Sequence, residues 1–298
     1  MRLLVAVDFS AFSEEVIRQI ESRPWPSGTQ ARLLHVVDTI TLSSGMINLG
    51  PYFELQTAAA TKMLESLAAR LTDKRISTSI EVVMGYPASR IPDYAGEWKP
   101  DLIMIGSHGR HALTNLLLGS VASAVLRKTG ESIEIVRCSA TAESAQEGLK
   151  ILLATDGSAC SDLAVHFVAK QPWSRGSAVE IVSVAEAAMP PIDPWVGADQ
   201  ILARINQETH RQAQDSLSAA GRVFEGSGIK FTAKILSGNA KAAIVEEARQ
   251  WNAGLVVVGS HGRQGLTRMM VGSVAEAVAA HAPCSVEVIR VEGSKDWG

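Results

Sequence analysis

Short apolar runs alternate with longer amphipathic stretches along this chain. Leu3–Val7 is a continuous apolar run of strand length, while Gln56–Leu71 repeats its apolar residues at helical spacing. Ser10 or Ser13 can cap an expected helix over Glu14–Glu21. Continuous apolar strands separated by helices are typical of a parallel sheet that is covered on both faces. The other expected elements of this half are Ala31–Val37, Ser77–Met84, Pro87–Ala95, Leu102–Ile105, Val121–Arg127 and Ile133–Arg137.

The whole pattern occurs twice. Gly106–Arg137 aligns with Gly259–Arg290 without a gap, and 16 of the 32 positions are identical. The opening Leu3–Ser10 likewise matches Ile151–Ser158. A repeat unit of about 145 residues is long enough to be a complete domain. The expected elements of the second half are Ala178–Ala185, Asp199–Phe224, Lys230–Leu236, Ala240–Trp251, Leu255–Val258, Val274–Ala280 and Val286–Val291.

The alternation predicts an α/β fold in two copies. Each copy reads as five strands separated by four helices, and right-handed crossovers make such a chain a doubly wound, Rossmann-like parallel sheet. A ligand crevice is then expected where the strand order reverses. We expect one domain over residues 1–138, a small and polar linker over 139–148, and a second domain over 149–292.

Composition and charge exclude several classes. With 46% hydrophobic and 20% charged residues, the chain is ordinary globular protein rather than disordered. Lys+Arg total 28 against 31 for Asp+Glu, which argues against binding nucleic acid by bulk charge. No apolar run reaches the roughly 18–20 residues that span a bilayer, so we expect no membrane segment. Three cysteines without a C-x-x-C pair favour the reducing cytoplasm over a disulfide framework or a zinc site.

A glycine pattern follows the fourth expected strand of each half. Glycines at a strand-to-helix turn let the backbone approach a ligand, and the N-terminus of the next helix attracts phosphate. The structural alternative is a plain turn, with Ser120 as an N-cap and Ser273-x-x-Glu276 as a capping box. The pattern reads Gly106-x2-Gly109-x9-Gly119-Ser120, and Gly259-x2-Gly262-x9-Gly272-Ser273.

An aspartate ends the first expected strand of each half, at the predicted crevice. Asp8 and Asp156 can accept hydrogen bonds from a ribose or a base, or they can simply cap the following helix. His108 and His261 lie inside the glycine turn, where they can meet phosphate, pack, or face solvent. The next residues of the turn, Arg110 and Arg263, are further candidate phosphate partners.

No catalytic or metal-binding set recurs in the two halves. The sequence lacks the Gly-x4-Gly-Lys-Ser/Thr of a P-loop and the Gly-x-Gly-x-x-Gly of a dinucleotide fold after the first strand. We therefore assign no catalytic residue and no metal ligand. The remaining histidines share no ligand spacing and are interpreted as incidental: His35, His111, His166, His210 and His281.

These motifs resemble those of the universal stress protein family, in a tandem arrangement that covers nearly the whole chain. The pattern Gly-x2-Gly-x9-Gly-Ser/Thr resembles that of its nucleotide-binding branch and is intact in both halves. Further segments that resemble the family are Val7-Asp8-Phe9-Ser10, Thr155-Asp156-Gly157-Ser158, Leu34-His35-Val36 and Gly85-Tyr86-Pro87-Ala88.

The resemblance implies a sheet like that of the adenine nucleotide alpha hydrolases, with ATP, AMP or ADP at the switch point, with or without magnesium. It also implies an internal pseudo-dimer through the fifth strands, Ile133–Arg137 and Val286–Val291, and further pairing of chains into a homodimer. Carried over by position, the binding residues are Asp8, Val36, Gly106, His108, Gly109, Gly119, Ser120 and Val121, and then Asp156, Val184, Gly259, His261, Gly262, Gly272, Ser273 and Val274.

Some positions depart from the family pattern. Pro92 stands inside the third helix and should break or shorten it. Ser183 replaces His35 in the second half, and the fifth strands carry acidic residues, Glu134 and Glu287, where apolar ones are usual. These departures call equal affinity of the two copies into question.

The leading functional hypothesis is a cytoplasmic nucleotide-binding protein of stress response or signalling, in which occupancy biases the choice of partner. An enzymatic alternative is slow ATP hydrolysis or phosphoryl transfer, which needs a metal site and a residue that positions the nucleophile. Since no such cluster stands beside the glycines, we do not expect an enzyme. A third alternative is an interaction scaffold that holds no ligand.

Overall fold

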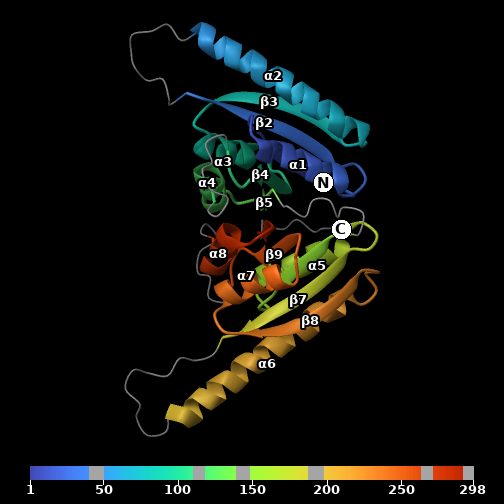
Figure 1. Cartoon of the computed structure of the whole chain (residues 1–298), viewed down its shortest axis with the longest axis vertical. Helices are drawn as coiled ribbons and strands as arrows, with labels where there is room; N and C mark the ends of the chain where they lie inside the picture. The colour runs from blue at the N-terminus through green and yellow to red at the C-terminus, as the bar shows by residue number, and fades with distance from the viewer. Residues whose placement is uncertain (40–49, 110–117, 139–147, 187–197, 263–270, 291–298) are drawn as a thin grey trace. The chain divides into compact units, whose positions relative to one another are not determined.

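The structure of the chain is a computed structural model that describes residues 1–39, 50–109, 118–138, 148–186, 198–262 and 271–290. The chain divides into two compact units, the first built mainly of Met1–Cys138 and the second beginning at Ser139. Within the described residues each unit alternates five strands with four helices (Figure 1). Residues 139–147 of the expected linker and the last two residues of the expected second domain lie outside the described residues.

The first unit is a parallel sheet in the order β3-β2-β1-β4-β5, and every strand pair given by its register is parallel. Because the order reverses between β1 and β4, the switch point lies at their carboxyl ends. The elements are β1 (Arg2–Ala6), α1 (Ala11–Ser22), β2 (Gln30–Asp38), α2 (Gly50–Asp73), β3 (Ser77–Gly85), α3 (Pro87–Trp98), β4 (Leu102–Gly106), α4 (Ser120–Lys128) and β5 (Ser132–Val136).

The second unit repeats this topology as β8-β7-β6-β9-β10, again with parallel pairs. Its switch point lies between β6 and β9. The α/β, doubly wound fold predicted from the sequence is confirmed. The elements are β6 (Lys150–Ala154), α5 (Ala159–Lys170), β7 (Ala178–Ala185), α6 (Ala198–Phe224), β8 (Lys230–Ser237), α7 (Ala240–Gln250), β9 (Leu255–Gly259), α8 (Ser273–His281) and β10 (Ser285–Ile289).

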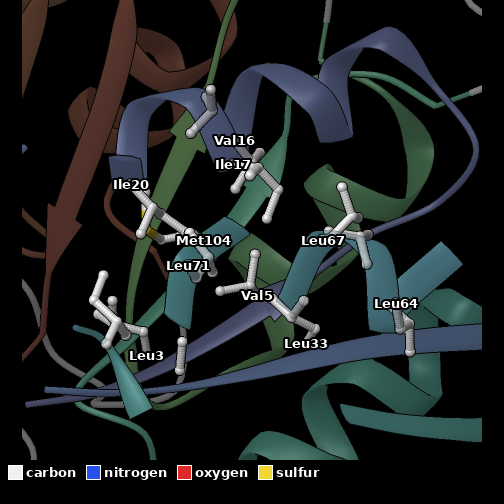
Figure 2. Close-up of a cluster of buried hydrophobic side chains, with 14 of the residues drawn as sticks. Leu3, Val5, Val16, Ile17, Ile20, Leu33, Leu64, Leu67, Leu71 and Met104 are labelled. Atoms are coloured by element: carbon white, nitrogen blue, oxygen red, sulfur yellow. The ribbon is translucent and has the colours of Figure 1, made fainter. Parts of the chain in front are cut away.

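The core of the first unit shows how the sheet is covered. Alternate residues of β1 face α1 and α2, because side chains of a strand point to opposite faces in turn. Figure 2 shows apolar side chains of both helices directed toward the strands. Right-handed crossovers place α3 and α4 on the opposite face. The labelled core residues are Leu3, Val5, Val16, Ile17, Ile20, Leu33, Leu64, Leu67, Leu71 and Met104.

The expected break at Pro92 is wrong. The helix α3 runs unbroken through Pro92 from Pro87 to Trp98. Pro92 has no N–H to donate to the carbonyl of Ala88, four residues earlier. The ammonium of Lys128 at the end of α4 lies 3.4 Å from that carbonyl oxygen and donates to it instead. A neighbouring helix thus replaces the missing hydrogen bond.

No helix among the described residues is long and apolar enough to cross a membrane.

Candidate functional site

The carboxyl end of β1 brings the candidate residues of three strands together. Ala6 pairs with Leu34 on β2 and with Ile105 on β4. The N–H of Val7 still donates to the Leu34 carbonyl at 3.0 Å, and Asp8 and Val36 then follow where the two strands end. In the second unit Ala154 pairs with Val182, and Asp156 and Val184 follow in the same way. The topology therefore brings the aspartates and the strand-two valines to the same edge of the sheet.

The carboxylate of Asp8 has one oxygen engaged within its own turn. Oδ1 accepts from the backbone N–H of Ser10 at 3.0 Å and from the hydroxyl of Ser13 at 2.9 Å. The Ser13 hydroxyl in turn accepts from the Asp8 backbone N–H at 2.8 Å. Ser10, rather than Asp8, is the N-cap of α1, and its counterpart Ser158 caps α5. The prediction that Ser10 can cap this helix is confirmed.

The second oxygen of each aspartate faces the glycine turn across the switch point. A Cβ added to Gly109 would stand 3.0 Å from Asp8 Oδ2, and one added to Gly262 would stand 2.8 Å from Asp156 Oδ2. Any side chain at these glycines would therefore push the carboxylate away. The two motifs that the sequence analysis singled out separately are in contact in both units.

The ends of each glycine turn are joined by one hydrogen bond. The N–H of Gly119 donates to the carbonyl of Ser107 at 2.8 Å, and that of Gly272 donates to the carbonyl of Ser260 at 2.7 Å. A Cβ on Gly119 would lie 3.0 Å from the Ser107 oxygen, so a side chain there would crowd the hydrogen bond that closes the turn. The intervening residues 110–117 and 263–270, which include Arg110 and Arg263, lie outside the described residues.

The first glycine of each pattern has a purely structural reason. A Cβ on Gly106 would stand 2.7 Å from the Cβ of Phe12, and one on Gly259 would stand 2.7 Å from the backbone of Cys160. A glycine at these positions lets α1 pack closely on the end of β4, and α5 on the end of β9. Close packing of these helices is thus sufficient reason for a glycine at both positions.

The helices α4 and α8 begin differently from the prediction. Their N-caps are Gly119 and Gly272, so Ser120 and Ser273 are the first helical residues, and neither cap makes a side-chain hydrogen bond. The predicted N-cap at Ser120 and capping box at Ser273 are therefore wrong. The glycine that closes each turn occupies the N-cap position, so each serine falls inside the helix.

Those uncapped N-termini are suited to an anion. The first N–H groups of a helix have no partner within it, and the helix dipole favours negative charge there. By contrast, α1 and α5 each have one of these N–H groups bonded to the hydroxyl of a capping serine. Val121 and Val274 follow as half-buried second residues of α4 and α8.

Each histidine of the turn has its Nδ1 within hydrogen-bond distance of the serine that precedes it in the chain. Nδ1 of His108 lies 3.1 Å from the Ser107 hydroxyl, and Nδ1 of His261 lies 3.0 Å from the Ser260 hydroxyl. The His108 ring also packs against Phe12, with ring centroids 5.2 Å apart. The ring contact favours a packing role for the His108 imidazole.

One buried histidine next to the candidate site makes a contact that the sequence analysis did not predict. His35, interpreted as incidental, is only 3% exposed, and its Nδ1 lies 2.9 Å from the carbonyl oxygen of Val7. A carbonyl oxygen only accepts, so Nδ1 donates. The imidazole thereby ties β2 to the residue just before Asp8. Its place next to Val36 on an expected strand was the signal that could have found it.

The donor set fits an anionic, hydroxylated ligand. Each switch point combines a carboxylate that accepts hydrogen bonds with the N-terminus of a helix that has glycine at its N-cap. No group of three or more His, Cys, Asp or Glu side chains in the described part of the chain is placed to hold a metal ion.

The comparisons with known proteins identify the family. Its model, described as the universal stress protein family, matches residues 1–137 and again 149–290. A universal stress protein of Mycolicibacterium smegmatis is 28% identical over 302 residues, which cover 97% of this chain and 96% of that one. One from Mycobacterium tuberculosis (strain H37Rv) is 29% identical over 218 residues, covering 73% and 70%.

Solved structures agree with this fold. The crystal structure of a universal stress protein from Archaeoglobus fulgidus superimposes with a TM-score of 0.66 at 22% identity, covering 97% of this chain and 96% of that one. The chain therefore belongs to the universal stress protein family, of which it carries two domains in tandem.

Proposed function

We propose that each unit binds an adenine nucleotide, ATP or its products ADP and AMP, at its switch point. Occupancy would bias the order of the neighbouring loops, and through them the choice of a partner in the cytoplasm during stress. A ligand shifts such an equilibrium only by its differential affinity for the two states, so no turnover is required.

One observation carries the proposal. In both units a carboxylate oxygen abuts the glycine turn, and the same turn ends on a helix whose N-cap is a glycine and so has no capping side chain of its own. An acceptor for a ribose or a base thus stands next to a donor site for phosphate. Family membership supports this interpretation through the glycine pattern, which is intact twice.

The residues take distinct parts in this proposal. Asp8 and Asp156 accept hydrogen bonds from the sugar or base, and Val36 and Val184 pack beside it. The backbone N–H groups at the start of α4 and α8 hold the phosphates, with Gly109 and Gly262 leaving room. The remaining proposed positions are Gly106, His108, Gly119, Ser120, Val121, Gly259, His261, Gly272, Ser273 and Val274. When magnesium accompanies ATP, it would neutralise phosphate charge.

The nucleotide content of freshly purified protein tests the proposal. The chain is denatured and adenine nucleotide is separated by ion-pair chromatography and counted per chain. Two per chain is expected if both units bind, and one if the copies have diverged. Gly109→Val and Gly262→Val each displace an aspartate and should each remove one nucleotide. Gly130→Val is the matched control, because no atom lies within 4 Å of a Cβ there.

The two alternatives make different predictions. A scaffold without ligand predicts no bound nucleotide and no thermal shift with Mg-ATP, and that pair of results would overturn the proposal. A slow ATPase predicts turnover above background that is lost in Asp8→Asn or Asp156→Asn. Binding without such turnover leaves the regulatory role standing.

We also propose that the two units pair through β5 and β10. A second proposal is that two chains pair into a homodimer. Sedimentation at several protein concentrations measures the mass of the assembly. Hydrogen exchange of the outer N–H groups of β5 and β10 reports whether these edges are paired. Rapid exchange at both edges would contradict the pseudo-dimer.

A further inference from the structure

Phe9 is a large apolar side chain that stands in the open beside the first candidate site. It follows Asp8 in the turn after β1, and 44% of its surface is exposed. Single exposed apolar residues are common on proteins, so exposure alone decides nothing. Its position next to the candidate aspartate is what makes it informative.

The ring of Phe9 packs against the imidazole ring of His35. The two rings meet edge to face, with centroids 5.4 Å apart and planes at 75°. His35 is itself buried and bound to the Val7 carbonyl, so its ring has a fixed position. His35 belongs to β2, which pairs with the strand that leads to Asp8. The Phe9 ring therefore packs against β2, next to the turn that carries the aspartate.

The second unit has neither ring. Gly157 occupies the place of Phe9 and has a φ of 73°, a left-handed conformation that favours glycine. Ser183, which is buried, occupies the place of His35. The backbone of this turn is thus built to do without a side chain, although the glycine turn opposite is the same in both units.

We propose that Phe9 is the stacking platform for the nucleobase in the first site, while the second site holds its ligand without an aromatic contact. This inference rests on the proposed nucleotide binding. An aromatic face stacks on any base, since every base has a π face, and such contacts are worth about tenfold or more in affinity per base. The first site should then discriminate a nucleoside triphosphate from inorganic triphosphate, and the second site should do so less.

Calorimetric titration of the full chain with ATP and with inorganic tripolyphosphate tests this. A Gly262→Val background removes the second site, so that only the first site is measured. Phe9→Leu keeps the apolar bulk and loses the π face, while Phe9→Tyr keeps the ring. We expect Phe9→Leu to weaken ATP about tenfold and leave tripolyphosphate unchanged, with Phe9→Tyr within about threefold of the parent.

A structural readout separates stacking from an indirect effect. Nuclear Overhauser contacts are expected between the Phe9 ring protons and the H2 or H8 protons of bound adenine. Unchanged ATP affinity in Phe9→Leu, or equal parental affinity for ATP and tripolyphosphate, would overturn the inference while nucleotide binding stands. No ATP binding to wild-type protein or any variant would instead overturn the proposed function, and the inference with it.

Discussion

The two units hold their aspartates with different hydrogen bonds, although the opposing glycine turns are alike. In the first unit the Ser13 hydroxyl donates to Asp8 Oδ1. In the second, the matching hydroxyl of Ser161 donates to the Ser158 carbonyl and accepts from Thr155. A hydroxyl has one proton, so Ser161 cannot also donate to the carboxylate of Asp156.

A single change explains the difference. Val7 precedes Asp8 in the first unit, whereas Thr155 precedes Asp156 in the second. The Thr155 hydroxyl lies 3.1 Å from that of Ser161 and also accepts from the N–H of Gly157 at 3.3 Å. A duplicated site can therefore diverge through the residue next to the functional one, while the functional residue stays the same.

The largest expected effect concerns an acidic residue of the fifth strand. Glu134 is fully buried on β5, and both its oxygens accept from the guanidinium of Arg23, at 2.7 and 2.9 Å. The second unit has Gln171 where the first has Arg23. Arg23→Gln should lower the unfolding free energy of the first unit by about 3 kcal/mol, because it leaves a buried carboxylate without its cation. Urea denaturation followed by hydrogen exchange measures this.

The double variant Arg23→Gln/Glu134→Gln is the control for that prediction. Removing both charges should recover most of the loss, since the cost comes from the unpaired carboxylate. A loss below about 1 kcal/mol in the single variant would show that the ion pair does not stabilise this unit.

Nucleotide should stabilise each unit separately. At a hundred times Kd, ATP adds about 2.7 kcal/mol to the folded state of the unit that binds it. Gly109→Val should remove this gain from the first unit alone, and Gly262→Val from the second alone. Hydrogen exchange resolves the two units in one experiment. A gain that survives both substitutions would place the nucleotide elsewhere.

The hydroxyl difference predicts unequal effects of two serine substitutions. Ser13→Ala removes a hydrogen bond to a charged carboxylate and should weaken ATP at the first site about tenfold. Ser161→Ala removes only contacts to neutral groups, so the second-site affinity should stay within about twofold. Titrations in Gly262→Val and Gly109→Val backgrounds, respectively, isolate each site. Equal losses at both sites would contradict the comparison.

The smallest expected effect is a pH dependence of stability that the second unit has and the first unit lacks. In the first unit, the guanidinium of Arg32 on β2 donates to the Tyr94 hydroxyl at 3.0 Å. The second unit has Glu180 in the place of Arg32 and Glu247 in the place of Tyr94. The ammonium of Lys234 lies 2.7 Å from both carboxylate oxygens of Glu247. Burial, and then repulsion from Glu247, raise the pKa of Glu180. The folded state thus holds this proton more tightly than the unfolded state does.

The proton on Glu180 stabilises the folded second unit at acid pH, and this stability is lost as the pH rises through the raised pKa of Glu180. Glu180→Gln should therefore stabilise the second unit by about 0.5–1 kcal/mol at pH 7, with the gain vanishing below the ordinary carboxyl range. Thermal unfolding across pH measures it, and Glu65→Gln on the exposed side of α2 is the control. A gain that does not depend on pH would rule out titration as the cause.

Much of the fold was predictable because its signals are local. Apolar runs, helical spacing and the repeated glycine pattern are properties of neighbouring residues, and they placed the strands and helices of both units. The capping serine Ser10 was also predictable, because an N-cap bonds within its own turn. Ser120 was not, because its place in α4 depends on the Ser107 carbonyl of another strand end.

The sequence by itself determined that this protein is a duplicated α/β chain with two copies of one glycine turn. Only the tertiary structure decided that Asp8 abuts Gly109, that Lys128 replaces the bond lost at Pro92, and that His35 donates to the Val7 carbonyl beside Asp8. The physical reason is that hydrophobic period and turn chemistry act over a few residues. The choice of hydrogen-bond partner depends instead on which distant strand ends the folded sheet brings within 3 Å or so of one another.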